Sequence, residues 1–500
     1  MLNFSFSPGL SKYLQRICRT TPMILGVALA FALGARAQAQ TWGLTNRYIF
    51  QGGISGPDGG TPYGGVIVGS DGNYYGTTWY GGTGGGTVFK ITPTGTESVV
   101  YAFSGPQDGQ LPFTLVQGLD GNFYGTTLWG GGANGYGIIF KVTPGGEETI
   151  LQSLTNTSGG PANPAAGLTL GADGNFYGTS SGGGADGQGT FFQITPAGVL
   201  TVLYSFGGAA GASPHGELIQ VKDGEFFGTT SQGGNGGYGT VFKVSTTGVL
   251  SVLHSFAGGS DGAQPAAPLI RGRDGAFYGT TQAGGTGGCA FPGLPTGCGT
   301  VFRITRDGKE SVIHDFAGYP TDGSNPLGGL VQARDGTFYG TTQAGGFTTP
   351  GNCFSGCGTI FSLTKTGTEQ ILIAFGTPTD TWYVAGWAPS GTLLLSADDT
   401  LTGTTQNGGG GWGNLFSIEP VPAMELTATP GTITLHGSTE IKWKSTHTQS
   451  CEATDAWNGA EAVAGRQREI PSATGLWTYT LTCTGIGGTV SASETVTVTQ

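Results

Sequence analysis

The segment DGNYYGTT at residues 71–78 decides the fold, because close copies of it recur along the chain about every 50 residues. Two further phrases, GTVFKIT at 86–92 and VVYAF at 99–103, follow it, and they also recur in the same order. The copies of the first phrase begin at Asp71, Asp120, Asp173, Asp223, Asp274, Asp335 and, in degenerate form, Asp398. A repeat of this length indicates a chain built from seven equivalent supersecondary units.

Each repeat contains four short apolar segments separated by turn residues, such as 299–305, 311–316, 329–332 and 338–342. These segments are rich in β-branched and aromatic residues, which is typical of strands. The Asp-Gly between the first two segments of a repeat is a hairpin signal. Four antiparallel strands per repeat predict the blades of a β-propeller. An open β-solenoid is the alternative.

The third phrase follows only six of the seven copies, and a seventh copy stands at the front of the chain in residues 47–50. If residues 46–52 form the outer strand of the last blade, both ends of the chain close the ring. A linear array of hairpins needs no such permutation, and closure hides sheet edges that invite aggregation. The sequence therefore predicts an all-β, seven-bladed β-propeller closed by an N-terminal strand.

The composition agrees with a β-rich fold that is dense in turns. Glycine accounts for 99 of the 500 residues and shows no three-residue period, which excludes collagen and long helices. Hydrophobic residues make up 37% and aromatic residues 11%, so the chain is not a disordered polar tract. The net charge of −11 and the absence of a basic stripe argue against nucleic acid and anionic membranes as partners.

Residues 1–39 have the pattern of a secretory signal peptide. Basic residues precede an apolar run at 23–33 that is too short to span a bilayer stably. Small residues at Ala37 and Ala39 offer cleavage sites, and an uncleaved anchor is the alternative. We expect a secreted or cell-surface protein, with no transmembrane segment in the mature chain, that acts as a monomer.

The repeat resembles the GloVer tandem repeat of exported bacterial proteins. The resemblance rests on the wording DGNxYGTT, GTVFKITPxG and LYSF, and it covers residues 43–418. It implies export and a repeat architecture. It implies no activity and no catalytic residue, because the family is defined by its repeat.

The tail is a separate module. Near Glu419 the glycine-rich repeat ends, and the Thr- and Ser-rich alternation of residues 421–500 predicts an Ig-like β-sandwich. Residues 441–446 and 478–485 resemble bacterial Ig-like modules, and that resemblance implies a disulfide between Cys451 and Cys483. The predicted domains are a signal peptide at 1–39, a propeller at 40–420 and an Ig-like sandwich at 421–500.

The remaining cysteines also fit an exported chain. Setting aside Cys18 in the signal peptide leaves six cysteines, an even number. Beside the pair in the tail, we expect bonds between Cys289 and Cys298 and between Cys353 and Cys357. These four cysteines could instead bind zinc, but their spacing lacks a pair of C-x2-C motifs. No cofactor is expected.

One face of the predicted propeller carries the variable loops, and loops over a rigid scaffold often carry binding function. Aromatic residues gather there in repeats seven, one and two, which are neighbours in a closed ring. They could stack on sugars or anchor a protein partner, whereas packing between blades is the alternative. The candidate binding residues are Trp79, Tyr80, Trp129, Trp382, Tyr383, Trp387 and Trp412.

The loop that leads into four of the repeats has the pattern D-G-x-x-P. A ring of four carboxylates at a channel mouth could hold a hard cation such as Ca²⁺. The alternative is a repeated turn in which each Asp caps the backbone, and a ring of four is too wide for direct coordination. The metal candidates are Asp58, Asp108, Asp261 and Asp322.

Signatures of catalysis are missing from the sequence, which has no HExxH motif and no P-loop. His254 and His314 occupy a strand position that is Tyr in other repeats, so we expect them to pack. We expect His215 and Glu148 to be solvated. The sequence thus favours an exported binding or scaffold protein, which recognises polysaccharide or a surface protein, over an enzyme. A carbohydrate-active lyase or hydrolase and a structural envelope protein are the alternatives.

Overall fold

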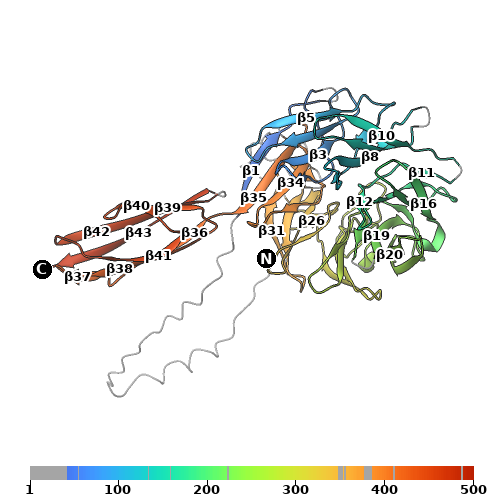
Figure 1. The fold of residues 1–500 in the computed structure, drawn as a ribbon. Helices are drawn as coiled ribbons and strands as arrows, with labels where there is room; N and C mark the ends of the chain where they lie inside the picture. The colour runs from blue at the N-terminus through green and yellow to red at the C-terminus, as the bar shows by residue number, and fades with distance from the viewer. Residues whose placement is uncertain are drawn as a thin grey trace, which may run out of the picture. The chain divides into compact units, whose positions relative to one another are not determined.

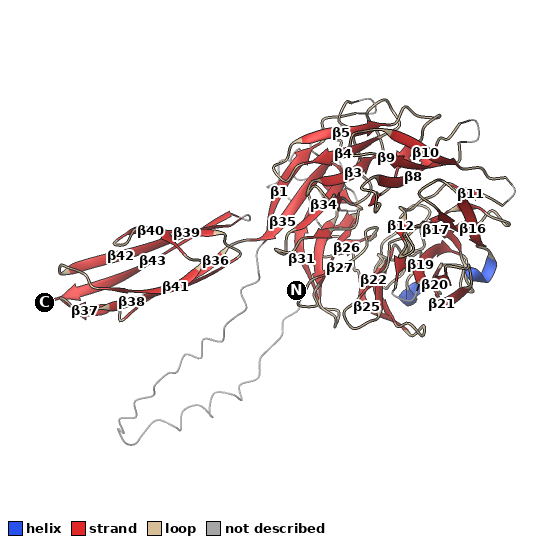
Figure 2. Cartoon of the chain, viewed as in Figure 1, coloured by secondary structure: helices blue, strands red, loops and turns tan. Residues whose placement is uncertain are grey.

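The computed structural model describes residues 42–53, 56–132, 135–157, 159–221, 224–346, 353, 356–376, 386–408, 411–485 and 488–500. Within these ranges the fold is all-β, as predicted, and its sheets are almost entirely antiparallel (Figure 2). The helical structure there consists of two single 3₁₀ turns, Gly208–Ala210 and Gly259–Asp261. None of the described residues belongs to a helix with the length and apolar character of a membrane span.

Each repeat forms one antiparallel sheet of four or five strands (Figure 1). The first contains β2 (Ile67–Val68), β3 (Tyr74–Thr78), β4 (Thr87–Ile91) and β5 (Glu97–Ala102). The second contains β6 (Gln110–Pro112), β7 (Val116–Gln117), β8 (Phe123–Trp129), β9 (Ile138–Val142) and β10 (Glu148–Ser153). The third contains β12 (Thr169–Leu170), β13 (Phe176–Ser180), β15 (Thr190–Ile194) and β16 (Leu200–Ser205), with a separate short pair, β11 (Pro161–Ala162) and β14 (Gly182–Gly183).

The later repeats follow the same plan. The fourth contains β17 (Ala212–Pro214), β18 (Ile219–Gln220), β19 (Glu225–Gln232), β20 (Thr240–Ser245) and β21 (Leu250–Ser255). The fifth contains β22 (Ile270–Arg271), β23 (Phe277–Thr281), β24 (Thr300–Ile304) and β25 (Glu310–Asp315). The sixth contains β27 (Val331–Gln332), β28 (Phe338–Thr342), β30 (Thr359–Leu363) and β31 (Glu369–Ala374), with the short pair β26 (Gly323–Ser324) and β29 (Ala344–Gly345).

The N-terminal strand belongs to the sheet of the last repeat. That sheet contains β32 (Trp387–Pro389), β33 (Leu394–Leu395), β34 (Leu401–Asn407) and β35 (Asn414–Pro420), and β1 (Trp42–Ile49) pairs with β35. Figure 1 shows β1, in blue, beside β35, in orange. The pairing agrees with the prediction for residues 46–52, although the strand begins and ends earlier in the chain. One buried cluster accordingly joins Phe50, Phe89 of the first repeat and Leu415 of the last.

Close packing requires the glycine near the end of DGNYYGTT. A Cβ at Gly76 would lie 2.6 Å from the ring of Phe89 on the paired strand β4. Because real Cβ contacts are not that close, only glycine fits beneath the ring. The same arrangement recurs in the other six sheets, where the rings belong to Phe140, Phe192, Phe242, Phe302, Phe361 and Phe416.

The aromatic pair before this glycine joins neighbouring sheets. The ring centroid of Tyr75 lies 4.1 Å from that of Phe123 in the next repeat. Such pairs contribute about 0.5–1.5 kcal/mol beyond their burial. Equivalent pairs are Tyr124–Phe176, Tyr177–Phe226, Phe227–Phe277 and Tyr278–Phe338. The degenerate seventh phrase lacks the aromatic residue, and there Trp42 of β1 lies 5.8 Å from Tyr339.

A strained residue also joins each repeat to the one before it. In every repeat the residue before the loop proline has a φ between 50° and 58°, and its N–H donates to a carbonyl of the preceding repeat. The N–H of Thr61 donates to the carbonyl of Trp412 at 2.7 Å, so the last repeat bonds to the first as every other pair does. The seven residues are Thr61, Leu111, Asn163, Ser213, Gln264, Asn325 and Ala388.

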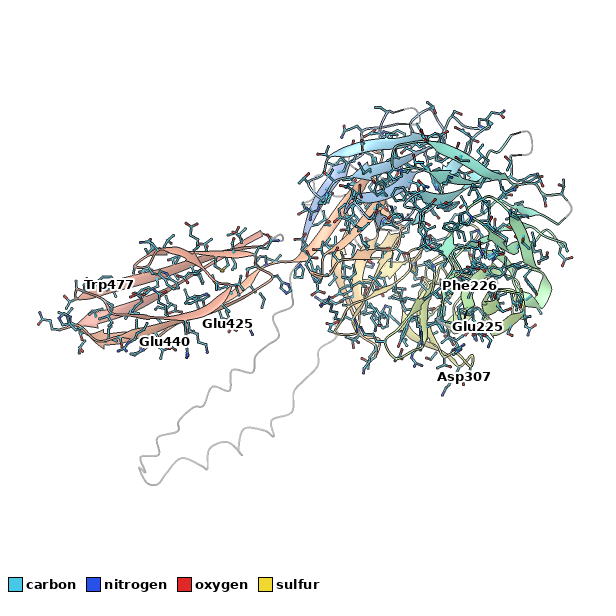
Figure 3. The ribbon with its side chains drawn as sticks, in the orientation of Figure 1. Glu225, Phe226, Asp307, Glu425, Glu440 and Trp477 are labelled. Atoms are coloured by element: carbon cyan, nitrogen blue, oxygen red, sulfur yellow. A yellow bond between two sulfur atoms is a disulfide. The ribbon has the colours of Figure 1, made fainter. Side chains whose placement is uncertain are left out.

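The side chains of Phe226 and Asp307 illustrate the core and the surface of the repeat region (Figure 3). Phe226 is fully buried, whereas Asp307 projects from an exposed turn before β25. Each buried cluster of the repeat region joins consecutive sheets, as Val88 and Phe103 of the first repeat join Ile138 of the second. The core therefore lies between sheets as well as within them.

The tail forms two sheets around its own core. The smaller contains β36 (Ala423–Thr429), β38 (Thr439–Thr446) and β41 (Ala464–Glu469). The larger contains β37 (Thr432–Thr434), β39 (Ser450–Asp455), β40 (Gly459–Glu461), β42 (Gly475–Gly485) and β43 (Gly488–Thr499). Trp443, Trp457 and Tyr479 occupy the core between them.

Three disulfides join the pairs that the sequence suggested, Cys289–Cys298, Cys353–Cys357 and Cys451–Cys483. The first two close the loop between β23 and β24 in repeat five and the loop between β28 and β30 in repeat six. Cys451 lies directly opposite Cys483 on adjacent strands of one sheet. An antibody-type Ig domain instead places its disulfide between the two sheets, so the tail departs from that arrangement.

Candidate functional site

A cavity of about 430 Å³ is lined by residues from all seven repeats. Ligand pockets commonly fall in this range of volumes. The residue immediately after the loop proline contributes to the wall in every repeat, and it lies two positions after the strained residue. These seven equivalent wall residues are Tyr63, Phe113, Ala165, His215, Ala266, Leu327 and Ser390. Strained backbone of this kind clusters at functional sites, because the surrounding structure must hold it in place.

Aromatic side chains form one part of the wall. The rings of Tyr63 and Trp79 stack with centroids 3.9 Å apart and an interplanar angle of 10°. Phe113 meets Trp79 edge-on at 6.0 Å. Burial raises the pKa of Tyr63, so its hydroxyl keeps its proton at neutral pH. This region offers flat apolar surface beside a hydroxyl group.

The fourth repeat contributes the ionisable part of the wall. Nδ1 of His215 lies 2.8 Å from the Ser213 carbonyl, so it carries the proton in that contact. Burial lowers the pKa of His215, which favours the neutral imidazole. Burial raises the pKa of Glu217 to about 7, and the hydroxyl of Thr114 donates to its Oε1. Near neutral pH this wall can both donate and accept hydrogen bonds, and it can exchange a proton.

His215 and Glu217 were not identified as site residues from the sequence. The expectation that His215 is a solvated loop residue was wrong, because its ring is partly buried in the cavity wall. One sequence signal could have found the wall. The residue after the loop proline varies from repeat to repeat while the proline itself is present in all seven, which is the pattern of a specificity-determining position.

The predicted aromatic residues divide into three groups. Trp79 lines the cavity, whereas Tyr80 and Trp129 are not among its lining residues and are 36% and 45% exposed. Trp387 and Trp412 are partly buried and pack against clusters between repeats, so they offer less surface to a ligand. Two further candidates, Trp382 and Tyr383, lie outside the described residues.

The four candidate aspartates cap turns. Carboxylate oxygens of Asp58 and Asp108 accept from the backbone N–H groups of Gln51 and Ser104. Asp261 and Asp322 accept in the same way from the backbone at residues 257 and 317. Among the described residues, two clusters of side chains could hold a metal ion, and each contains only one of these aspartates. The four aspartates therefore do not share a single calcium site.

Comparisons with known proteins identify the repeat over part of the chain. Residues 112–346 match the model of the Gloeobacter/Verrucomicrobia repeat family. This match agrees with the resemblance that the recurring phrases indicate. The search of curated proteins found no significant match.

Two solved structures show a distant likeness. The extracellular domain of a hybrid two-component system from B. thetaiotaomicron is 10% identical, with a TM-score of 0.47 over 91% of this chain. This chain spans 57% of that protein's length. A gluconolactonase from Xanthomonas campestris is 14% identical, with a TM-score of 0.36 over 67% of this chain and 90% of its own.

Proposed function

We propose that residues 40–420 form a closed seven-bladed propeller and residues 421–500 an Ig-like sandwich. Two observations support closure. The strained residue of the first repeat hydrogen-bonds to the last repeat, as the equivalent residue does between every other pair of neighbouring repeats. In addition, strand β1 completes the last sheet. Seven repeats that all contribute to one cavity fit a ring around a central axis better than an open solenoid.

We propose that the protein is exported. Three disulfides need an oxidising compartment to form, and they close loops in the propeller and a strand pair in the tail. The expected signal peptide at 1–39 and the resemblance to repeats of exported proteins point to the same location. The protein would then meet its ligand outside the cytoplasm.

Its proposed activity is binding of polysaccharide, through recognition of one or two sugar units in the cavity. The observation that carries this proposal is the ring of equivalent wall residues, aromatic in repeats one and two and ionisable in repeat four. Flat aromatic surface contacts the apolar face of a sugar. His215, Glu217 and the Tyr63 hydroxyl would hydrogen-bond its hydroxyl groups. Tyr80 and Trp129 would extend the contact beyond the cavity.

The experiment is retention of the mature chain on an array of polysaccharides and oligosaccharides, with Trp79→Ala and Glu217→Gln as test variants. We expect each variant to weaken binding about tenfold or more, since central aromatic and buried polar contacts dominate recognition. Tyr238→Ala is the matched control, because Tyr238 is 37% exposed in an equivalent loop and does not line the cavity. Equal affinity of all four proteins, or no retention by the parent chain, would overturn the proposal.

The alternative function is a sugar lyase or hydrolase. His215 and Glu217 favour it, because a neutral imidazole and a carboxyl with a pKa of about 7 are suited to proton transfer at neutral pH. New reducing or unsaturated ends in the same wells, lost in Glu217→Gln, would select this alternative over simple binding.

A further inference from the structure

The loop aspartates lie where the last strands of two neighbouring sheets meet, and we call each such place a junction. Four junctions contain the same kind of triplet. It consists of a Tyr or His near the end of one last strand, the Asp of the loop that follows, and the Glu that begins the next last strand. The triplets are Tyr48–Asp58–Glu97, Tyr101–Asp108–Glu148, His254–Asp261–Glu310 and His314–Asp322–Glu369.

The Glu of a triplet occurs only where the loop supplies an Asp. Strands β16 and β21 begin with Leu200 and Leu250, and the loops that meet them, at 154–161 and 206–214, contain no Asp. At these six places where neighbouring repeats meet, Asp and Glu therefore occur together or are both missing. Because the Asp lies in the loop before a repeat and the Glu on the last strand of that repeat, the two are far apart in the sequence, and their joint occurrence suggests that the carboxylates act as a unit.

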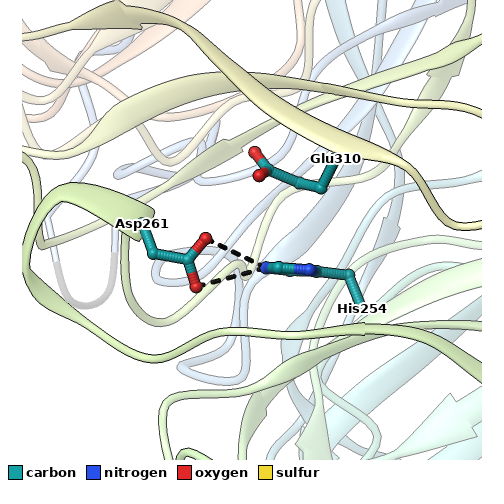
Figure 4. Close-up of side chains that lie close together, drawn as sticks. All are labelled: His254, Asp261 and Glu310. Atoms are coloured by element: carbon teal, nitrogen blue, oxygen red, sulfur yellow. Dashed lines mark hydrogen bonds and ion pairs between the residues drawn. The ribbon is translucent and has the colours of Figure 1, made fainter.

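The first residue is His in two of the triplets and Tyr in the other two, and we call these the His junctions and the Tyr junctions. Nε2 of His254 lies 3.1 and 3.2 Å from the two carboxylate oxygens of Asp261. Figure 4 shows the carboxyl group of Glu310 beside this pair. One ligand atom from each of the three residues lies within 4.8 Å of the others, and the same holds for His314, Asp322 and Glu369.

Polar atoms at the His junctions are buried without hydrogen-bond partners among the described residues. They are Oε1 of Glu310, Oε1 of Glu369 and Nε2 of His314, which lies 3.7 Å from Asp322. A buried acceptor without a partner destabilises the fold, and two facing carboxylates add repulsion. A cation between them would remove both costs at once.

We propose that each His junction binds a divalent transition-metal ion, Zn²⁺ being the probe, through the imidazole Nε2 and one oxygen from each carboxylate. Nitrogen and carboxylate donors are normal zinc ligands, and three protein ligands leave a fourth position for water. Calcium and magnesium prefer all-oxygen sites, so they fit less well. The ion would join the last strand of one repeat, its loop and the next repeat. None of these ligands lines the cavity, so this proposal is independent of the proposed binding function.

The rings of both histidines are already held in place. His254 meets Phe256 edge-on with centroids 4.7 Å apart, and His314 meets Phe316 at the same distance. The side chains remain partly open to solvent, at 20% exposure for His254 and 14% for His314. Ordered ligands with a route from solvent are what an ion needs to enter.

The experiment measures zinc bound per mature chain after removal of metal with a chelator and titration with Zn²⁺. We expect two ions per chain, one ion for His254→Tyr or His314→Tyr, and none at these sites in the double variant. The change to Tyr uses the residue that the chain itself carries at the other two junctions, so the fold should survive. Tyr101→Phe is the control and should keep both ions.

A thermal melt provides the second readout. Zinc at 100 times its Kd should stabilise a site by about 2.7 kcal/mol, and the double variant should lose this gain. The proposal is overturned if zinc fails to bind, or if the double variant binds as much zinc as the parent. Equal stabilisation of both proteins by Ca²⁺ would also contradict it, because the site would then not depend on imidazole.

Discussion

The Tyr junctions and the His junctions have the same backbone frame and the same two carboxylates, and they differ in one side chain. The Tyr48 hydroxyl donates to Asp58 at 2.7 Å, and the Tyr101 hydroxyl donates to Asp108 at 2.9 Å. His254 places a nitrogen in the equivalent position. Burial and the neighbouring Asp raise the pKa of both tyrosines, so they keep their protons near neutral pH and offer no lone pair as basic as that of an imidazole. A His at the same position can offer a lone pair. One substitution thus decides whether a junction holds a proton or can hold an ion.

Removing the shared Asp should have the largest effect, because it caps a turn in both kinds of junction. Asp58→Ala would leave the Tyr48 hydroxyl and the Gln51 N–H without their acceptor. We expect about 3 kcal/mol of lost unfolding free energy in urea with chelator present, since hydrogen bonds to a charged group contribute about 1.5–3 kcal/mol. Asp261→Ala should cost a similar amount.

The control for this prediction is Asp186→Ala, an exposed loop position where surface substitutions change stability by about 0.5 kcal/mol or less. If Asp261→Ala cost as little as the control while Asp58→Ala cost several times more, the two kinds of junction would not share a frame. The Asp would then have different structural roles in the Tyr junctions and the His junctions.

Placing a His in a Tyr junction should create a further metal site there. Tyr101→His would place an imidazole beside Asp108 and Glu148, and we expect one additional zinc ion per chain. The gain in stability should be about 2–3 kcal/mol at 100 times the Kd, relative to the same variant in chelator. Tyr101→Phe removes the hydroxyl without adding a ligand and should gain no ion. If Tyr101→His also gains none, features beyond the imidazole distinguish the two kinds of junction.

Much of this architecture could be predicted from the sequence, because the same turn and strand signals recur in seven repeats. The Asp-Gly turns, the strand order and the N-terminal strand in the last sheet follow from the recurring phrases and from the third phrase at residues 47–50. The cavity wall could not be predicted, since it combines single residues from segments far apart in the chain. Glu148 was expected to be solvated, and this was wrong. It begins β10 and lies partly buried near Asp108, which lies in the loop before the first strand of the same repeat.

The smallest effect concerns pH, and it can be tested at the two Tyr junctions. Burial, and then the charge of the nearby Asp, raises the pKa of Glu97 and of Glu148 to about 7, above the ordinary value of 4.5. The folded state therefore binds more protons than the unfolded state between these values. Their contribution to stability is fully present below about pH 4.5 and is lost as the pH rises through about 7.

We therefore expect Tm in chelator to fall between pH 5 and pH 8, and the Glu97→Gln/Glu148→Gln double variant to show a smaller fall. Gln keeps the shape of Glu but has no proton to lose. Glu147→Gln, next to Glu148 but exposed, should leave the fall unchanged. A double variant with the full fall would mean that the two carboxyls do not titrate as a buried pair with Asp58 and Asp108. The inference that Glu97 and Glu148 hold a proton in the folded state would then be wrong. The metal proposal for the His junctions would be unaffected, because zinc binding tests it separately.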